Sequence, residues 1–253
     1  MGSLQDLQLP EDQRWNDVIS SARAIAKALE EIHKLGFLHH DLHPGNVVFL
    51  SLKYPILIDI GLAQAIEDAQ DESGAYGRLD YLPPEVFDDK PYTTASDIYC
   101  LGTVIWQLIT GVPPQETSAY AVHNRADKLR EDPIPGAPDA LMNIIKDCWN
   151  LDSAQRPSAR QVVMRLDQAV TMINPDVAIW PLPEEIEALK WRSPATMLFV
   201  AERRAAHQQS LTESDTFSYA NGNSQFYSSA QLRVVSEKHT VSSLQSMAVQ
   251  SDV

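Results

Sequence analysis

His39-His40-Asp41-Leu42-His43-Pro44-Gly45-Asn46 places a carboxylate and a side-chain amide five residues apart in a segment rich in turn-forming residues. Phosphoryl transfer uses such a pair, because a carboxylate can accept the proton of an attacking hydroxyl and an amide oxygen can bind Mg²⁺. Asp41 and Asn46 are therefore the first candidate site residues.

Two apolar runs follow this segment, residues 46–50 and 55–58, and predict a short β-hairpin. The second run leads directly into Asp59-Ile60-Gly61, which places another carboxylate beside a glycine turn. A single turn aspartate is common in any fold. The ordered set Asp41, Asn46 and Asp59 is a much stronger indication of a metal site.

The rest of the first two thirds of the chain predicts helices. Residues 16–35 show apolar positions at spacings of three and four, which predicts an amphipathic helix that ends at Gly36. Residues 96–110 are apolar on nearly every side, as expected of a helix buried all round. Residues 138–149 and 158–173 predict two more amphipathic helices. The expected fold is mainly α.

Composition divides the chain into three parts. Residues 1–173 predict the folded domain, with a mobile surface loop at the acidic segment 67–74. Residues 174–208 predict a helical extension or linker, with one or two charged helices over 184–208. Residues 209–253 are rich in serine and poor in large apolar residues, so we expect a disordered tail.

Charge and cysteine content exclude several classes of partner and location. The formal net charge of −14 argues against nucleic acid or an anionic membrane as the main partner. Cys100 and Cys148 both lie in apolar helical patterns, which indicates buried, reduced thiols. With no signal peptide and no apolar run of membrane-spanning length, the sequence predicts a soluble cytoplasmic protein.

Five motifs together resemble the C-terminal, large lobe of a eukaryotic protein kinase. Within that family they are most similar to the tyrosine-kinase-like Ser/Thr branch. Residues 38–46 resemble the catalytic loop of that family, and we use this name for them below. Asp59-Ile60-Gly61 resembles the metal-binding Asp-Phe-Gly, and Pro83-Pro84-Glu85 resembles the Ala-Pro-Glu that closes the activation segment. Residues 96–102 resemble the buried helix whose aspartate braces the catalytic loop. Cys148-Trp149 and Arg156-Pro157-Ser158 resemble the closing Cys-Trp and Arg-Pro of the family.

The resemblance implies a site that uses ATP and Mg²⁺ to phosphorylate a protein hydroxyl. Asp41 would orient and deprotonate that hydroxyl, and Asn46 and Asp59 would hold Mg²⁺ against the nucleotide phosphates, with Gly61 beside them. It also implies that Glu85 and Arg156 form a buried ion pair, and that Asp97 supports the loop.

Three positions depart from the family pattern. His43 is a candidate catalytic residue that replaces a lysine which neutralises the transferred phosphate. His40 replaces an arginine that pairs with a phosphorylated activation segment, so control by phosphorylation at Ser73 or Tyr76 is not expected. Arg78 replaces a threonine, and either pairs with nearby carboxylates or lies on the surface.

The sequence also predicts that the small β lobe is absent. Only 40 residues precede Asp41, and no Gly-x-Gly-x-x-Gly occurs. We therefore expect this chain alone to be nearly inactive, with a missing small lobe or a partner protein covering the exposed cleft.

Three functions stay open. The first is a protein kinase whose small lobe lies outside this sequence; Gly45, which offers no basic group to the loop, favours Ser/Thr specificity. The second is a pseudokinase that acts as a binding module. The third is a small-molecule phosphotransferase of the aminoglycoside or choline kinase type, which the opening motif fits but the downstream motifs oppose.

Overall fold

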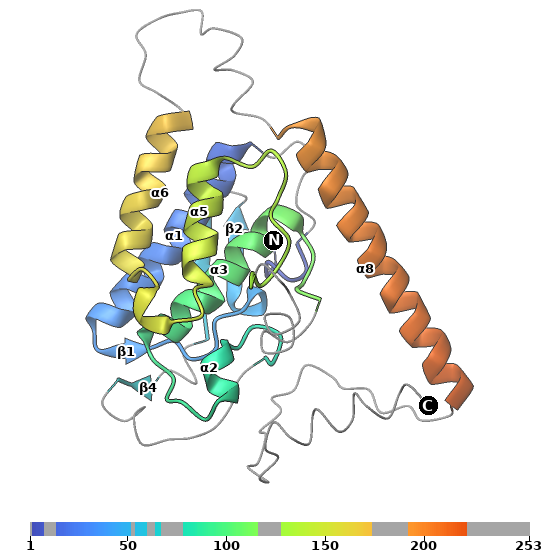
Figure 1. The fold of residues 1–253 in the computed structure, drawn as a ribbon, viewed down its shortest axis with the longest axis horizontal. Helices are drawn as coiled ribbons and strands as arrows, with labels where there is room; N and C mark the ends of the chain where they lie inside the picture. The colour runs from blue at the N-terminus through green and yellow to red at the C-terminus, as the bar shows by residue number, and fades with distance from the viewer. Residues whose placement is uncertain are drawn as a thin grey trace, which may run out of the picture.

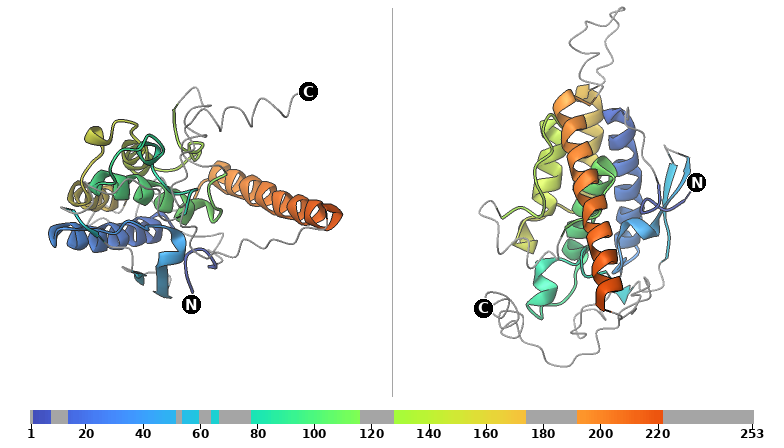
Figure 2. Two further views of the ribbon diagram at one scale, coloured as in Figure 1. Left: turned by 90° about the horizontal axis from the view of Figure 1, so that it is seen from below. Right: turned by 90° about the vertical axis from the view of Figure 1, so that its right-hand side faces the viewer.

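The computed structural model describes residues 2–7, 14–51, 54–59, 64–66, 78–115, 128–173 and 192–221. These residues form a body of helices with two small two-stranded sheets, and a long helix that leads away from it (Figures 1 and 2). The expectation of a mainly helical fold with a short hairpin is confirmed. The acidic segment 67–74 lies outside the described residues.

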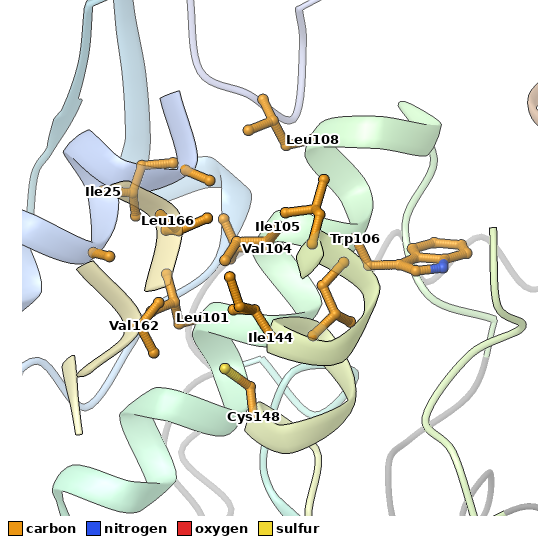
Figure 3. Packing of buried hydrophobic residues seen from close by; sticks show 14 of the residues in the cluster. Ile25, Leu101, Val104, Ile105, Trp106, Leu108, Ile144, Cys148, Val162 and Leu166 are labelled. Carbon is orange, nitrogen blue, oxygen red and sulfur yellow. The ribbon is translucent and has the colours of Figure 1, made fainter. Parts of the chain in front are cut away.

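Four helices make the body: α1 (Trp15–Lys34), α3 (Thr94–Thr110), α5 (Asp139–Cys148) and α6 (Ala159–Ile173). α1 packs against α6 and α3, and α5 packs against α3 and α6. The apolar side chains of all four helices meet in one core (Figure 3): Ile25 from α1, Leu101, Val104 and Ile105 from α3, Ile144 and Cys148 from α5, and Val162 and Leu166 from α6. Burial of this apolar surface is the main force that holds the body together.

α3 is the central helix, as its sequence predicts. Its residues from Ser96 to Thr110 are all buried, and Thr93 and Ser96 cap its first turn reciprocally. Gly102 lets α5 approach closely, since a Cβ there would lie 2.8 Å from the Cβ of Cys148. α3 therefore provides a rigid base for whatever contacts its first turn.

α1 ends where the sequence predicts, and the chain then enters the catalytic loop. Gly36 has φ = 81°, a left-handed conformation that glycine adopts without strain. β1 (Phe37–Leu38) follows and pairs antiparallel with β4 (Gln64–Ala65). The loop continues through a 3-10 turn, η1 (Pro44–Asn46), into β2 (Val47–Ser51).

β2 pairs antiparallel with β3 (Tyr54–Leu57), which confirms the predicted hairpin. The first residues of the chain also lie along β2: the N–H of Leu4 donates to the carbonyl of Val47, and the N–H of Phe49 donates to the carbonyl of Gly2. The N-terminal segment thus lies beside the catalytic loop.

Two short elements close the rest of the body. α2 (Pro84–Phe87) begins within the Pro83-Pro84-Glu85 motif, and η3 (Ser153–Gln155) precedes Arg156. A second, smaller apolar cluster lies between α2 and the loop and contains Leu38, Leu82, Val86 and Tyr92.

α8 (Pro194–Asn221) leans on α3 near its start and then runs away from the body (Figures 1 and 2). Val200 is buried, and Arg203 forms a 2.7 Å ion pair with Glu131. The prediction of disorder from Gln209 is wrong for residues 209–221, which continue α8. The composition argument considered only apolar area, whereas a helix already anchored at its start extends through its own backbone hydrogen bonds. Residues 222–253 lie outside the described part of the chain.

None of the helices in the described ranges is both long enough and apolar enough to cross a membrane.

Candidate active site

Asp97, at the first turn of α3, holds the start of the catalytic loop. Its carboxylate accepts hydrogen bonds from the backbone N–H groups of His39 at 2.8 Å and His40 at 3.0 Å. The hydroxyl of Tyr92 donates to it at 2.9 Å, and Nε2 of His33 lies 2.8 Å away. Burial opposes ionisation of Asp97, but these hydrogen bonds outweigh it and lower the pKa of the carboxyl. The predicted bracing role of Asp97 is supported by these contacts.

His39 and His40 belong to the buried part of the loop. His39 is fully buried, and burial is the main reason that its pKa is lowered, so its imidazole is neutral at pH 7. His40 has φ = 66°, and its ring lies 4.3 Å from the ring of Tyr92. His40 is buried, and its ring packs against Tyr92 inside the fold.

Asp41 and Asn46 contact each other directly. Nδ2 of Asn46 donates to the carbonyl oxygen of Asp41 at 2.9 Å and to its carboxylate at 3.2 Å. Both protons of the amide thus face Asp41, which leaves Oδ1 of Asn46 as the atom that can bind a cation. Burial would raise the pKa of Asp41, but hydrogen bonds from His43 and Asn46 outweigh it and leave the pKa below its ordinary value. Asp41 is ionised at pH 7, as a proton acceptor must be.

His43 is oriented by both of its ring nitrogens. Nδ1 accepts a hydrogen bond from the N–H of Gly45 at 3.0 Å, so it carries no proton. Nε2 therefore carries the proton, and it lies 3.5 Å from the carboxylate of Asp41. In this arrangement Nε2 of His43 faces the carboxylate of Asp41.

The β2–β3 hairpin brings Asp59 to the same end of the loop. The N–H of Ile58 donates to the carbonyl of Asn46 at 2.9 Å, which places Ile58 beside the end of the loop. Asp59 is the next residue in the chain. Asp59 is exposed and has φ = 59°, a left-handed conformation that is uncommon for residues other than glycine. Such backbone strain is found most often where a side chain has a functional task. Gly61 lies outside the described residues.

These residues fit Mg²⁺ carried by a nucleotide better than a permanently bound metal. No group of three or more His, Cys, Asp or Glu side chains in the described ranges could hold a metal ion by itself. Mg²⁺ in phosphoryl-transfer sites needs only one or two protein oxygens, because phosphates and water supply the others. Oδ1 of Asn46 and the carboxylate of Asp59 would provide such a pair.

Glu85 and Arg156 form the buried ion pair that the resemblance implies. The guanidinium donates to both carboxylate oxygens of Glu85, at 2.6 and 2.7 Å, and to the carbonyls of Ala95 and Asn150. Ser96 also donates to Glu85. This network ties α2 to the start of α3 and to the segment after α5, so it fixes the chain on the far side of the loop.

A surface hollow of about 520 Å³ lies away from this site, between η3 and α6. Its two arginines are already paired, Arg156 with Glu85 and Arg165 with Asp147. The hollow has no cluster of candidate catalytic groups, and we assign it no chemistry.

The structure adds four residues to the site that the sequence did not reveal: Gln5, His33, Tyr81 and Tyr92. Gln5 accepts a hydrogen bond from Arg78, and the rings of His43 and Tyr81 lie 6.1 Å apart. His33 and Tyr92 act through Asp97. None of the four belongs to a motif, and only their contacts identify them.

Comparisons with the sequences of known proteins point to the same family as the motifs. The family model described as the protein kinase domain matches residues 5–165. The serine/threonine/tyrosine-protein kinase HT1 of Arabidopsis thaliana is 29% identical over 154 residues, which cover 60% of this chain and 40% of that protein. A calcium and calcium/calmodulin-dependent serine/threonine-protein kinase of Pisum sativum is 31% identical over 150 residues, which cover 55% of this chain and 28% of that protein.

The chain thus spans less than half the length of these relatives. The matched region of the chain contains the catalytic loop, Asp59, the Glu85 network and the four helices of the body, apart from the last residues of α6. The chain belongs to the protein kinase family.

Proposed function

We propose that this chain forms the large lobe of a protein kinase that transfers the γ-phosphoryl group of ATP to a serine or threonine hydroxyl. The lobe would comprise residues 1–173, followed by an extension over residues 174–208 and a tail. Because α8 continues to residue 221, the boundary between extension and tail moves to that residue. The observation that carries the proposal is the contact of Asp41 with both Asn46 and His43 at the end of the hairpin that also carries Asp59.

The proposed reaction assigns one task to each side chain. Asp41 accepts the proton of the substrate hydroxyl as its oxygen bonds to the γ-phosphorus; the bond from that phosphorus to the β–γ bridging oxygen breaks, and ADP leaves with the electron pair. Asn46 fixes the carboxylate of Asp41, and Asn46 and Asp59 would hold Mg²⁺, which would supply charge neutralisation to the phosphates when bound. His43 keeps Asp41 ionised through its Nε2 proton.

Three further expectations belong to this proposal. A protein is the expected substrate or partner, since the relatives are named as protein kinases. Binding of ATP and Mg²⁺ is inferred from the family and the residues of the site. A cytoplasmic location stays a prediction.

A single-turnover assay tests the proposal. The chain is incubated with Mg²⁺, millimolar γ-labelled ATP and a generic protein substrate such as myelin basic protein. We expect slow transfer to serine or threonine, because the sequence contains no Gly-x-Gly-x-x-Gly loop that could grip the phosphates. Asp41→Asn should lower the rate by about 10²–10⁴-fold, the usual contribution of a general base.

Asn143→Ala, on the exposed face of α5, is the matched control and should transfer at the wild-type rate. Equal rates for the wild type and Asp41→Asn would refute the kinase proposal. The burial of His40, which removes a basic group from the loop, would then favour a binding module of the pseudokinase type.

A further inference from the structure

Arg78 belongs to a cluster at the catalytic loop that the proposed mechanism does not use. Nη1 of Arg78 donates to Oε1 of Gln5, in the N-terminal segment that lies along β2. The same Oε1 lies 3.2 Å from the position that a Cβ on Gly45 would occupy. Gln5 therefore connects the guanidinium of Arg78 to the middle of the loop.

A second path of contacts leads to the same place. The Cζ atom of Arg78 lies 5.5 Å from the centre of the Tyr81 ring, a cation–π arrangement. The Tyr81 ring lies 6.1 Å from the His43 ring, and Nε2 of His43 lies 3.5 Å from the carboxylate of Asp41. Two sets of contacts, one through Gln5 and one through Tyr81, thus connect Arg78 to the loop that carries Asp41.

The charge of the site gives this position a consequence. Phosphoryl transfer spreads negative charge over the oxygens of the moving group, and nearby cations stabilise it. Both ring nitrogens of His43 are engaged, Nδ1 by the N–H of Gly45 and Nε2 by the carboxylate of Asp41, so neither is directed at a phosphate. Arginine, in contrast, is charged at every physiological pH and donates two parallel hydrogen bonds to phosphate oxygens.

The acceptor that Arg78 contacts in the described part of the chain is the neutral amide of Gln5, so that contact does not cancel its charge. We propose that Arg78, held by Gln5 and Tyr81, is the cation that contacts the transferred phosphoryl group, in place of a basic residue within the loop. This inference rests on the proposed kinase function. The bonds formed and broken are those given above, and Arg78 only contacts the oxygens of the moving group.

Inorganic phosphate provides a test that needs no turnover. The backbone amide of Gly45 is followed by NMR while phosphate is added to the full chain. We expect a saturable shift in the wild type and in Asp41→Asn. Arg78→Ala should weaken the apparent affinity about tenfold or more, as expected for loss of a charge-assisted hydrogen bond, and Arg78→Lys should retain part of it.

Two controls separate this from a general effect of net charge. Arg160→Ala removes the same charge from an exposed position at the start of α6 and should leave the affinity unchanged. Adding His43→Lys to Arg78→Ala should restore binding, because it places a cation within the loop. If transfer is measurable, Arg78→Ala should lower its rate, and the double variant should recover part of it.

The proposal is overturned if the wild type shows no phosphate shift at Gly45, or if Arg78→Ala binds phosphate as the wild type does. It is also overturned if Arg160→Ala weakens binding equally. A chain that binds phosphate through Arg78 but transfers nothing would refute the kinase function alone.

Discussion

In the first half of the catalytic loop, His39 and His40 are buried and their backbone N–H groups are fixed by Asp97. In the second half, Asp41 and His43 are partly open to solvent and contact mainly each other and Asn46. The buried half depends on a charge inside the core, so changes there should cost stability. The open half carries the proposed catalytic residues, so changes there should alter protonation and catalysis with little effect on folding.

Asp97→Ala should give the largest effect. It leaves two buried backbone N–H groups without acceptors, at about 1–3 kcal/mol each, and leaves the hydroxyl of Tyr92 only its contact with the sulfur of Cys100. We expect the free energy of unfolding, measured in urea, to fall by about 3–6 kcal/mol. Hydrogen exchange at His39 and His40 should accelerate. A loss below about 1 kcal/mol would mean that Asp97 does not hold the buried half.

Arg156→Met tests the other buried interaction near the loop, the ion pair between Glu85 and Arg156. It leaves Glu85 buried without its ion-pair partner, which should cost about 3–5 kcal/mol in urea unfolding. Arg165→Met is the matched control: its pair with Asp147 is of similar length, 2.7 Å, but is exposed. The control should lose no more than about 1 kcal/mol. Similar losses in the two variants would contradict the assignment of a buried anchor.

His43→Ala should give the smallest change in stability and a clear change in protonation. The hydrogen bond from His43 is the strongest influence that lowers the pKa of Asp41, whereas burial raises that pKa. Without His43 the pKa of Asp41 should rise, as followed by carboxyl ¹³C NMR, while unfolding changes by about 1 kcal/mol or less. An unchanged pKa would show that His43 does not act on Asp41.

The sequence predicted the parts of the fold that show a periodic signal. α3 has apolar residues on all sides and is buried, and the runs 46–50 and 55–58 form the hairpin. The pairing of the N-terminal segment with β2 has no such signal, since a single bridge at Ser3 requires no pattern. The extension of α8 was missed for a related reason: its later residues lack an apolar face that sequence could reveal.

In the site, too, the residues that belong to motifs were predictable from the sequence, whereas those that act through contacts in the fold were not. Asp41, Asn46 and Asp59 were predicted from order and spacing, and the hairpin brings their backbones to one end of the loop. The tautomer of His43 and the neighbours of Arg78 were not predictable. They depend on contacts with Gly45 and Gln5 that only the folded chain creates.

The proposed site requires that Asn46 and Asp59 bind one metal ion together with a nucleotide. Paramagnetic Mn²⁺ tests it directly, because it broadens NMR signals of the groups that lie near it. With ATP and Mn²⁺, the side-chain amide signals of Asn46 should broaden in the wild type and stay sharp in Asp59→Asn, while those of Asn143 on α5 stay sharp in both. An Asn46 signal that ATP and Mn²⁺ leave sharp in the wild type would contradict the account.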